Sequence, residues 1–153
     1  MDPQEKKKTT AREVLRTVKY ALIAASAGII QIGTFTLLNE LLEWDKWVSY
    51  LIALVLSVLW NFTLNRRYTF QSAANVKKAM LLVFLYYLVF TPLSTWLEHF
   101  LTDTCGWNEY LVTAINMLIN FVTEFLYQRF VVFRDTLDTN DLAKKERSSA
   151  GRS

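Results

Sequence analysis

The sequence lacks most of what a soluble enzyme or a secreted domain would use. Its 153 residues include only 4 Gly, 2 Pro, 1 Cys and 1 His. Cys105 has no partner for an intrachain disulfide, which excludes the disulfide-stapled class of small secreted domains. The sequence contains no Gly-rich phosphate loop and no spacing of metal ligands, and His99 has no nucleophile near it. We therefore expect no enzyme activity, no metal and no cofactor.

Charged residues are missing from long parts of the chain, and the last of these apolar stretches contains a single one, Glu124. A helix of about 20 apolar residues crosses the hydrocarbon core of a bilayer. A soluble globular domain is therefore excluded, and the expected fold class is all-α, a polytopic membrane four-helix bundle. The pattern predicts spans at residues 20–42, 47–64, 79–97 and 110–132.

Basic residues are strongly biased to one side of these spans. Of the 17 Lys and Arg residues, only Lys46 falls in a loop on the other side. The positive-inside rule then predicts a multi-pass protein of the cell membrane whose termini and middle loop are cytoplasmic. Topology explains the basic excess, so nucleic acid is not an expected partner. Aromatic residues at the opposite boundary suggest a belt at headgroup depth, made of Trp44, Trp47, Tyr50, Trp107 and Tyr110.

The two ends of the chain are polar. We expect residues 1–10 to be a disordered N-terminus, residues 11–134 to form the transmembrane domain, and residues 135–153 to be a disordered tail. Apolar residues from Ala11 to Val18 recur at helical spacing opposite Arg12, Arg16 and Lys19. This pattern predicts an interfacial helix that runs into the first span and contacts membrane lipids.

One sequence element occurs twice, at the ends of the second and fourth spans. A shift of 63 positions aligns residues 60–70 with residues 123–133. The first and third spans match more weakly, residues 38–40 against 97–99. Two hairpins of the same orientation would form a parallel repeat, as in some transporter folds. The aligned pairs are Ser57 with Asn120, Asn61 with Glu124, Phe62 with Phe125, Asn65 with Gln128, Arg66 with Arg129 and Phe70 with Phe133.

These motifs make the chain resemble the GtrA family, small four-span membrane proteins linked to polyprenyl-phosphate sugars. The resemblance covers residues 14–134 and rests on Asn-Arg-Arg-Tyr-Thr-Phe at 65–70 and Gln-Arg-Phe-Val-Val-Phe at 128–133. The family usually shows Asn-Arg in both places, so Gln128 is a departure. The resemblance implies that a sugar linked to undecaprenyl phosphate or another polyprenyl phosphate is moved across the membrane for cell-surface polysaccharide glycosylation. The competing implication is a non-transporting anchor or accessory subunit of a membrane glycosyltransferase.

Polar residues within the spans form two stripes at helical spacing. The second span carries Ser57, Asn61 and Asn65, and the fourth carries Asn116, Asn120, Glu124 and Gln128. Such side chains need partners in hydrocarbon, so both stripes should face the bundle interior or another subunit. Two interpretations stay open: hydrogen bonds that hold the helices together, or binding of sugar hydroxyls by Asn61, Asn65, Asn116, Asn120, Glu124 and Gln128.

Glu124 is the one carboxylate in these stripes. Arg129 points to another face of the same helix, so Arg66, Arg67 or Lys19 from a neighbouring helix could pair with it. Its repeat counterpart, Asn61, is a neutral amide. The position is therefore expected to need hydrogen bonding more than charge.

Arginines lie at one end of each stripe. We expect Arg66, Arg67 and Arg129 to bind the substrate phosphate, because a guanidinium fork suits phosphate oxygens. The alternative is positive-inside anchoring, which we favour for Lys77 and Lys78. For Arg66 and Arg129 we favour phosphate binding, because both arginines recur at the same position relative to the amide residues of their stripes.

A different class, the small multidrug resistance-like proton-coupled exporters, also combines four short spans with one membrane carboxylate. Those proteins carry the carboxylate in the first span, and the charge bias here is too strong for dual insertion. Because four short helices leave little room for a sugar head, we expect a homo-oligomer or a complex with a membrane glycosyltransferase.

Overall fold

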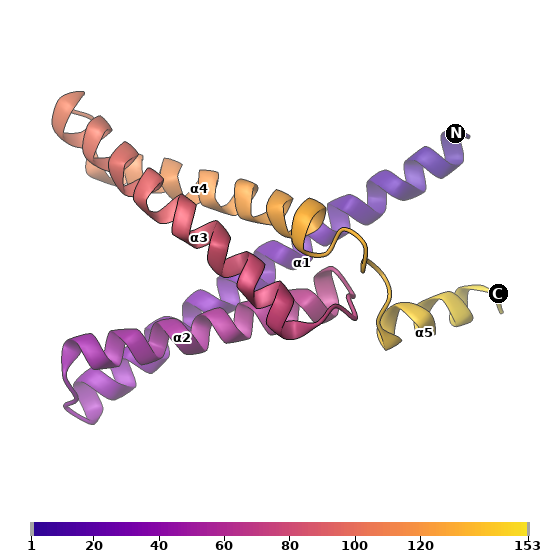
Figure 1. The fold of residues 1–153 in the computed structure, drawn as a ribbon, viewed down its shortest axis with the longest axis horizontal. Helices are drawn as coiled ribbons and strands as arrows, with labels where there is room; N and C mark the ends of the chain where they lie inside the picture. The colour runs from indigo at the N-terminus through magenta and orange to yellow at the C-terminus, as the bar shows by residue number, and fades with distance from the viewer. Residues whose placement is uncertain (1, 153) are drawn as a thin grey trace. The chain divides into compact units, whose positions relative to one another are not determined.

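The computed structural model describes residues 2–152, and within them the chain is all-α, without a strand (Figure 1). Each long helix except the last ends in a short π-helical turn. In order, the elements are α1 Pro3–Thr36, η1 Leu37–Leu41, α2 Lys46–Leu64, η2 Asn65–Thr69, α3 Val76–His99, η3 Phe100–Thr104, α4 Glu109–Tyr127, η4 Gln128–Val132 and α5 Asp141–Ala150.

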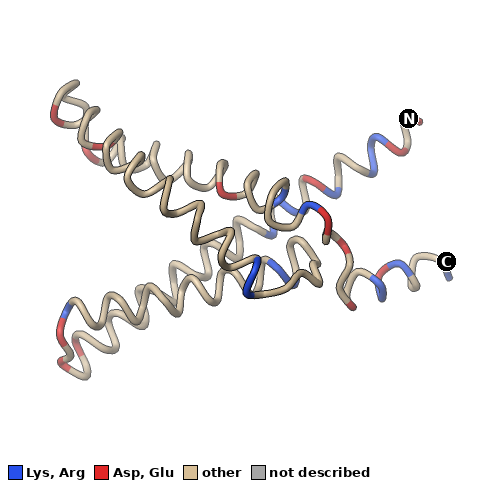
Figure 2. Tube along the Cα trace, viewed as in Figure 1, with Lys and Arg blue, Asp and Glu red and all other residues tan. Residues whose placement is uncertain are grey.

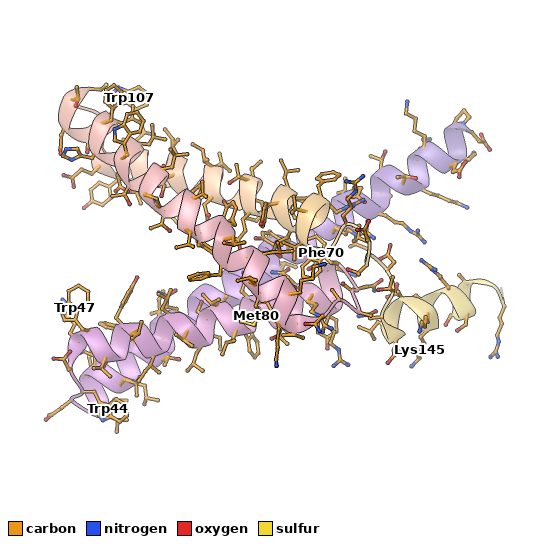
Figure 3. The ribbon with its side chains drawn as sticks, in the orientation of Figure 1. Trp44, Trp47, Phe70, Met80, Trp107 and Lys145 are labelled. Atoms are coloured by element: carbon orange, nitrogen blue, oxygen red, sulfur yellow. The ribbon has the colours of Figure 1, made fainter. Side chains whose placement is uncertain are left out.

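Four of these segments are long and apolar enough to cross a membrane, which confirms the predicted fold class. They are Pro3–Leu41, Lys46–Thr69, Val76–Thr104 and Glu109–Val132. The helix of the first segment begins well before residue 20, because the amphipathic stretch continues into the apolar one without a break. The predicted aromatic residues lie at the hairpin turns, where Figure 3 shows Trp44 and Trp47 beside one turn and Trp107 beside the other.

The ends of the chain differ from our expectation of disorder. Residues 3–10 belong to α1, whose first turn is capped by the Asp2 side chain and has a proline at its start. The tail contains α5, which the Asn140 side chain caps at Ala143 N. Helix caps at both ends and hydrogen bonds of the tail to the end of α2 stabilise these segments, which composition alone does not predict. The first and last residues of these expected disordered segments, Met1 and Ser153, lie outside the described residues.

The chain forms two compact units, described separately here. The first contains the residues up to Ala73 together with those from Leu137 on. Its core is the α1–α2 hairpin, in which Ser57 Oγ donates to Ala27 O at 2.9 Å and Trp60 Nε1 donates to Ser26 Oγ at 3.0 Å. The small buried side chain of Ala27 permits this close approach.

The second unit, Ala74–Thr136, is the α3–α4 hairpin. Its helices are joined mainly by tyrosines. Tyr127 OH donates to Leu82 O at 2.8 Å, and the Tyr86 ring lies 5.2 Å from the Tyr127 ring. Aromatic rings fill the space between α3 and α4, whereas in the first unit a small residue lets α1 and α2 approach closely.

The element boundaries repeat at the same 63-residue shift as the motifs. Helices α2 and α4 both contain 19 residues, and their starts, their caps and their π-helical turns match at this shift. The left-handed residues of the two turns, Glu43 with φ 53° and Gly106 with φ 69°, also correspond. The first and third spans follow the same shift, with Leu37–Leu41 opposite Phe100–Thr104, so residues 38–40 do not align with 97–99.

Candidate functional site

A buried pair of polar side chains lies at the end of each duplicated helix. In the first unit Asn65 Nδ2 donates to Asn61 Oδ1 at 2.9 Å, and in the second Gln128 Nε2 donates to Glu124 Oε1 at 3.0 Å. Asn65 is 0% exposed and Gln128 1%. The two stripes predicted from spacing therefore contain the same hydrogen bond at equivalent positions.

The pairs differ in how far their acceptors are satisfied. Thr69 Oγ1 donates to Asn65 Oδ1 at 2.7 Å, which completes the chain of bonds in the first unit. The counterpart of Thr69 is Val132, which has no hydroxyl. Gln128 Oε1 is accordingly buried without a hydrogen-bond partner among the described residues. The second unit thus keeps an unused acceptor, which costs free energy in a buried site unless a ligand donor meets it.

Glu124 has donors that the sequence did not identify. Tyr87 OH donates to Glu124 Oε2 at 2.7 Å, from the facing helix α3, and Gln128 donates to the other oxygen. Glu124 is only 5% exposed. In the sequence, Tyr87 stands out only as a hydroxyl within a stretch of apolar residues. Its partner becomes known only from the packing of α3 against α4.

The remaining residues of this stripe also contact α3. Tyr86 OH donates to Asn120 Oδ1 at 3.2 Å. Further along, Asn116 Nδ2 donates to Ser94 O at 3.3 Å and to Glu98 Oε2 at 3.4 Å. A line of polar contacts therefore follows the α3–α4 interface from Gln128 to Glu98. At Asn116 and Asn120 these bonds also hold the two helices together.

The line ends in an open cavity beside the α3–α4 turn. The cavity has a volume of about 550 Å³, and neither Lys nor Arg is among its lining residues. Hydroxyls and carboxylates dominate the lining, which consists of Thr95, Thr102, Thr113, Glu98, Glu109, Tyr110 and His99. Such a surface offers hydrogen bonds to a polyhydroxylated group, and its imidazole, the one lining group that could carry positive charge, is paired with Asp103. Within residues 2–152 no three His, Cys, Asp or Glu side chains gather as a metal site would require.

The arginines of the duplicated motif occupy the π-helical turns. Arg66 and Arg67 lie in η2 and Arg129 in η4, directly after the second residue of the polar pair of each unit. The Arg67 guanidinium lies 5.5 Å from the Tyr68 ring, and that of Arg129 lies 5.0 Å from the Phe130 ring. Stacking on a ring restricts the plane of a guanidinium.

Charge is distributed in the same way within each unit (Figure 2). In the first, Lys and Arg gather where α1 begins and α2 ends, and the α1–α2 turn carries acidic residues with Lys46. In the second, basic residues flank the start of α3 and the end of α4, and the turn between them is acidic. The polar pairs and their arginines thus lie toward the basic end of each hairpin.

Comparison with known proteins agrees with this architecture. The cell wall teichoic acid glycosylation protein GtcA of Listeria monocytogenes is 26% identical over 130 residues, which are 80% of this chain and 87% of that protein. No solved structure matches the chain. The profile of the GtrA/DPMS transmembrane domain matches residues 19–133, which include the first apolar segment from Lys19 on, the other three in full and both arginine motifs. The chain is therefore a multi-pass membrane protein that belongs to the GtrA/DPMS transmembrane domain family.

Proposed function

We propose that the protein moves a polyprenyl-phosphate-linked sugar across the cell membrane for glycosylation of a cell-surface polymer. The observation that carries the proposal is the duplicated end of α2 and α4, where a buried polar pair precedes an arginine in a π-helical turn. The name of the Listeria relative, which links it to glycosylation of cell wall teichoic acid, supports this process.

In this proposal the arginines bind the phosphate. Arg66, Arg67 and Arg129 lie at the basic ends of the hairpins, where a phosphate would be held at the membrane surface. A guanidinium presents parallel N–H donors to phosphate oxygens, and stacking of Arg67 and Arg129 on neighbouring rings orients those donors. Positive charge at this depth compensates the phosphate without burying an unpaired ion.

The polar residues deeper in each hairpin bind the sugar. Asn61 and Asn65 offer amide groups, while Glu124 and the unpartnered Gln128 Oε1 offer acceptors to sugar hydroxyls. Asn116 and Asn120 continue the polar line toward the cavity at the α3–α4 turn. That cavity, lined by hydroxyls, carboxylates and His99 but by no Lys or Arg, suits an uncharged sugar better than a phosphate.

The proposed role is non-catalytic, with both termini and the middle loop in the cytoplasm, as the charge bias indicates. The phosphate would then bind on the cytoplasmic side and the sugar would leave on the other. Because four short helices leave little room for a sugar head, we propose that a second copy of the chain or a membrane glycosyltransferase completes the path.

Reconstitution in liposomes tests the proposal. Purified protein, without a transferase, should carry a labelled undecaprenyl-phosphate sugar from the outer to the inner leaflet, measured by protection from an impermeant oxidant of sugars. Empty liposomes and liposomes containing an unrelated four-span protein are the controls. No movement, together with a stable complex with a glycosyltransferase, would contradict transport and favour the accessory role. Efflux of cationic drugs driven by a proton gradient would favour an exporter.

A further inference from the structure

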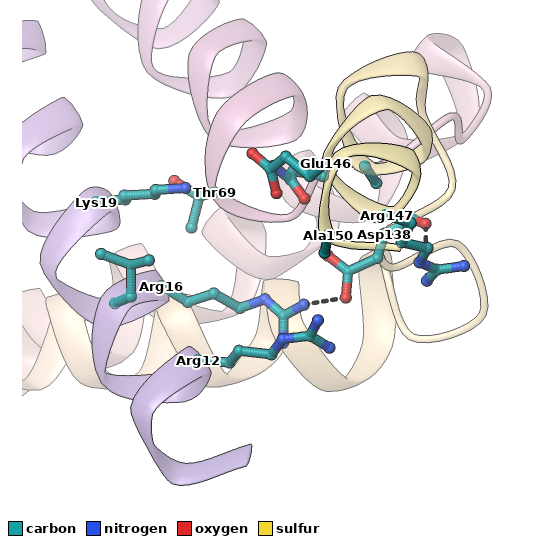
Figure 4. A pocket seen from close by; sticks show the side chains of 11 residues that line it. Arg12, Arg16, Lys19, Thr69, Asp138, Glu146, Arg147 and Ala150 are labelled. Carbon is teal, nitrogen blue, oxygen red and sulfur yellow. Dashed lines mark hydrogen bonds and ion pairs between the residues drawn. The ribbon is translucent and has the colours of Figure 1, made fainter. Parts of the chain in front are cut away.

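A cavity of about 390 Å³ lies in the first unit (Figure 4). Three parts of the chain form its walls: the start of α1, the segment at the end of η2, and the tail with α5. None of the residues to which we assign phosphate or sugar binding lines it. It therefore needs an explanation of its own.

Tail contacts make this cavity a built feature of the fold. Asp138 N donates to Phe70 O at 3.1 Å, and Asn140 N donates to Gln71 O at 2.9 Å. The Asn140 side chain donates to Arg67 O at 2.9 Å, and Gln71 Nε2 donates to Glu146 Oε1 at 3.0 Å. Backbone and side-chain bonds thus fix the tail against the end of α2, so its cavity-facing groups have defined positions.

Basic groups outnumber acidic ones around the cavity. Helix α1 contributes Arg12, Arg16 and Lys19, which share one face because they lie four and three residues apart, and α5 contributes Arg147. The acidic lining residues are Asp138 and Glu146. Figure 4 shows the Arg12 and Arg16 side chains extending from α1 toward Asp138 and Arg147.

Only part of this positive charge is used within the chain. Arg16, 9% exposed, pairs with Asp138 and Glu13. Arg12 has no hydrogen bond or ion pair within residues 2–152, and Lys19 Nζ reaches only Tyr68 O, at 3.5 Å. Like charges gathered in a partly enclosed space repel one another unless an anion joins them. Arg147 donates to Asp138 O at 3.3 Å, so Arg12 and Lys19 are the cavity's basic groups that the chain uses least.

We propose that this cavity binds a phosphate group, as a second anion site separate from the duplicated arginines. Phosphate fits better than a second carboxylate, because its oxygens can accept from Arg12, Lys19 and Arg147 together. The phosphate could come from a soluble phosphate compound or from a lipid headgroup. A lipid is included because the cavity adjoins the apolar stretch of α1 that begins after Lys19. This inference does not depend on the proposed function.

Calorimetric titration of the full-length protein in uncharged detergent micelles tests it. One titration uses inorganic phosphate and a second uses short-chain phosphatidic acid, so that the stronger signal distinguishes a soluble phosphate from a lipid one. We expect saturable binding at one site in at least one titration. The double variant Arg12→Ala, Lys19→Ala should weaken that binding by about tenfold or more, since charged hydrogen bonds are lost.

The matched control removes the same charge elsewhere on α1. Lys7→Ala, Lys8→Ala lowers the net charge equally, outside the cavity lining, and should leave the affinity unchanged. Absence of binding in both titrations, or equal loss in the two double variants, would overturn the proposal. Helix content by circular dichroism and elution volume identify a variant that fails to fold.

Asp138→Asn provides a second variant that keeps the backbone bonds of the tail. Removing the competing carboxylate should tighten phosphate binding, because the Arg16 N–H group that pairs with Asp138 is then available to the ligand while the Glu13 pair remains. If Asp138→Asn instead weakens binding as much as the Arg12 and Lys19 double variant, the cavity is not an anion site.

Discussion

Replacement of Glu124 separates a hydrogen-bonding role from a titrating one. Glu124 accepts from Tyr87 at 2.7 Å and from Gln128 at 3.0 Å, and it is almost fully buried. Glu124→Leu removes both acceptors and leaves two donors inside the hairpin. Hydrogen bonds between transmembrane helices contribute about 0.6 kcal/mol on average and up to about 1.7 kcal/mol. For two bonds, the expected loss in free energy of unfolding is therefore about 1–3 kcal/mol.

Glu124→Gln should cost less than about 1 kcal/mol, because it retains one acceptor and gains a donor. A flip of the Gln128 amide would let its Oε1, which has no partner among residues 2–152, accept from the new amide N–H group. The variant would also match the Asn61–Asn65 pair of the other hairpin. Transport should remain close to the wild-type rate in Glu124→Gln and should fail in Glu124→Leu.

The assay combines unfolding in a series of detergent mixtures with sugar-lipid movement in liposomes at equal protein abundance. Full loss of movement in Glu124→Gln, with normal stability, would refute the hydrogen-bonding role. It would indicate a carboxylate that exchanges protons during transport, most clearly if wild-type movement also stops when the pH gradient is removed.

Two further predictions concern the repeat and the topology. Val132→Thr supplies the hydroxyl that Thr69 provides in the other hairpin, so it should donate to Gln128 Oε1 and stabilise the protein by about 0.6 kcal/mol. The control Val112→Thr, at another buried valine, should bring no such gain. Equal destabilisation by both, measured by detergent unfolding, would contradict the equivalence of the two ends. In sealed cells, exposed Cys105 should react with an impermeant thiol reagent, whereas a cysteine at position 78 should be protected; the reverse pattern would invert the orientation.

The parts of this architecture that depend on local pattern could be predicted from the sequence. Four spans follow from the length of the apolar stretches, and the polar stripe from Asn116 to Gln128 follows from spacing of four residues. The bond between Glu124 and Gln128 connects residues on one helix, one turn apart, so helical periodicity alone brings them together.

The parts that depend on packing could not be predicted. Tyr87 lies 37 positions before Glu124, and no spacing rule relates the two. Arg16 and Asp138 are 122 positions apart, and they meet because the tail turns back to the end of α2 through bonds to the backbone of Gln71. The composition of the tail is that of a disordered segment, so its order depends on contacts that only the folded hairpin supplies.

The most direct test of the central claim compares three single variants in the liposome assay. Arg66→Ala and Arg129→Ala should each abolish sugar-lipid movement at normal abundance and topology, whereas Lys77→Ala, an exposed basic residue at the start of α3, should retain it. Equal loss in all three variants would indicate a diffuse electrostatic effect. Loss of abundance or topology in the two arginine variants alone would show that they anchor the helices, and would contradict phosphate binding by the duplicated motif.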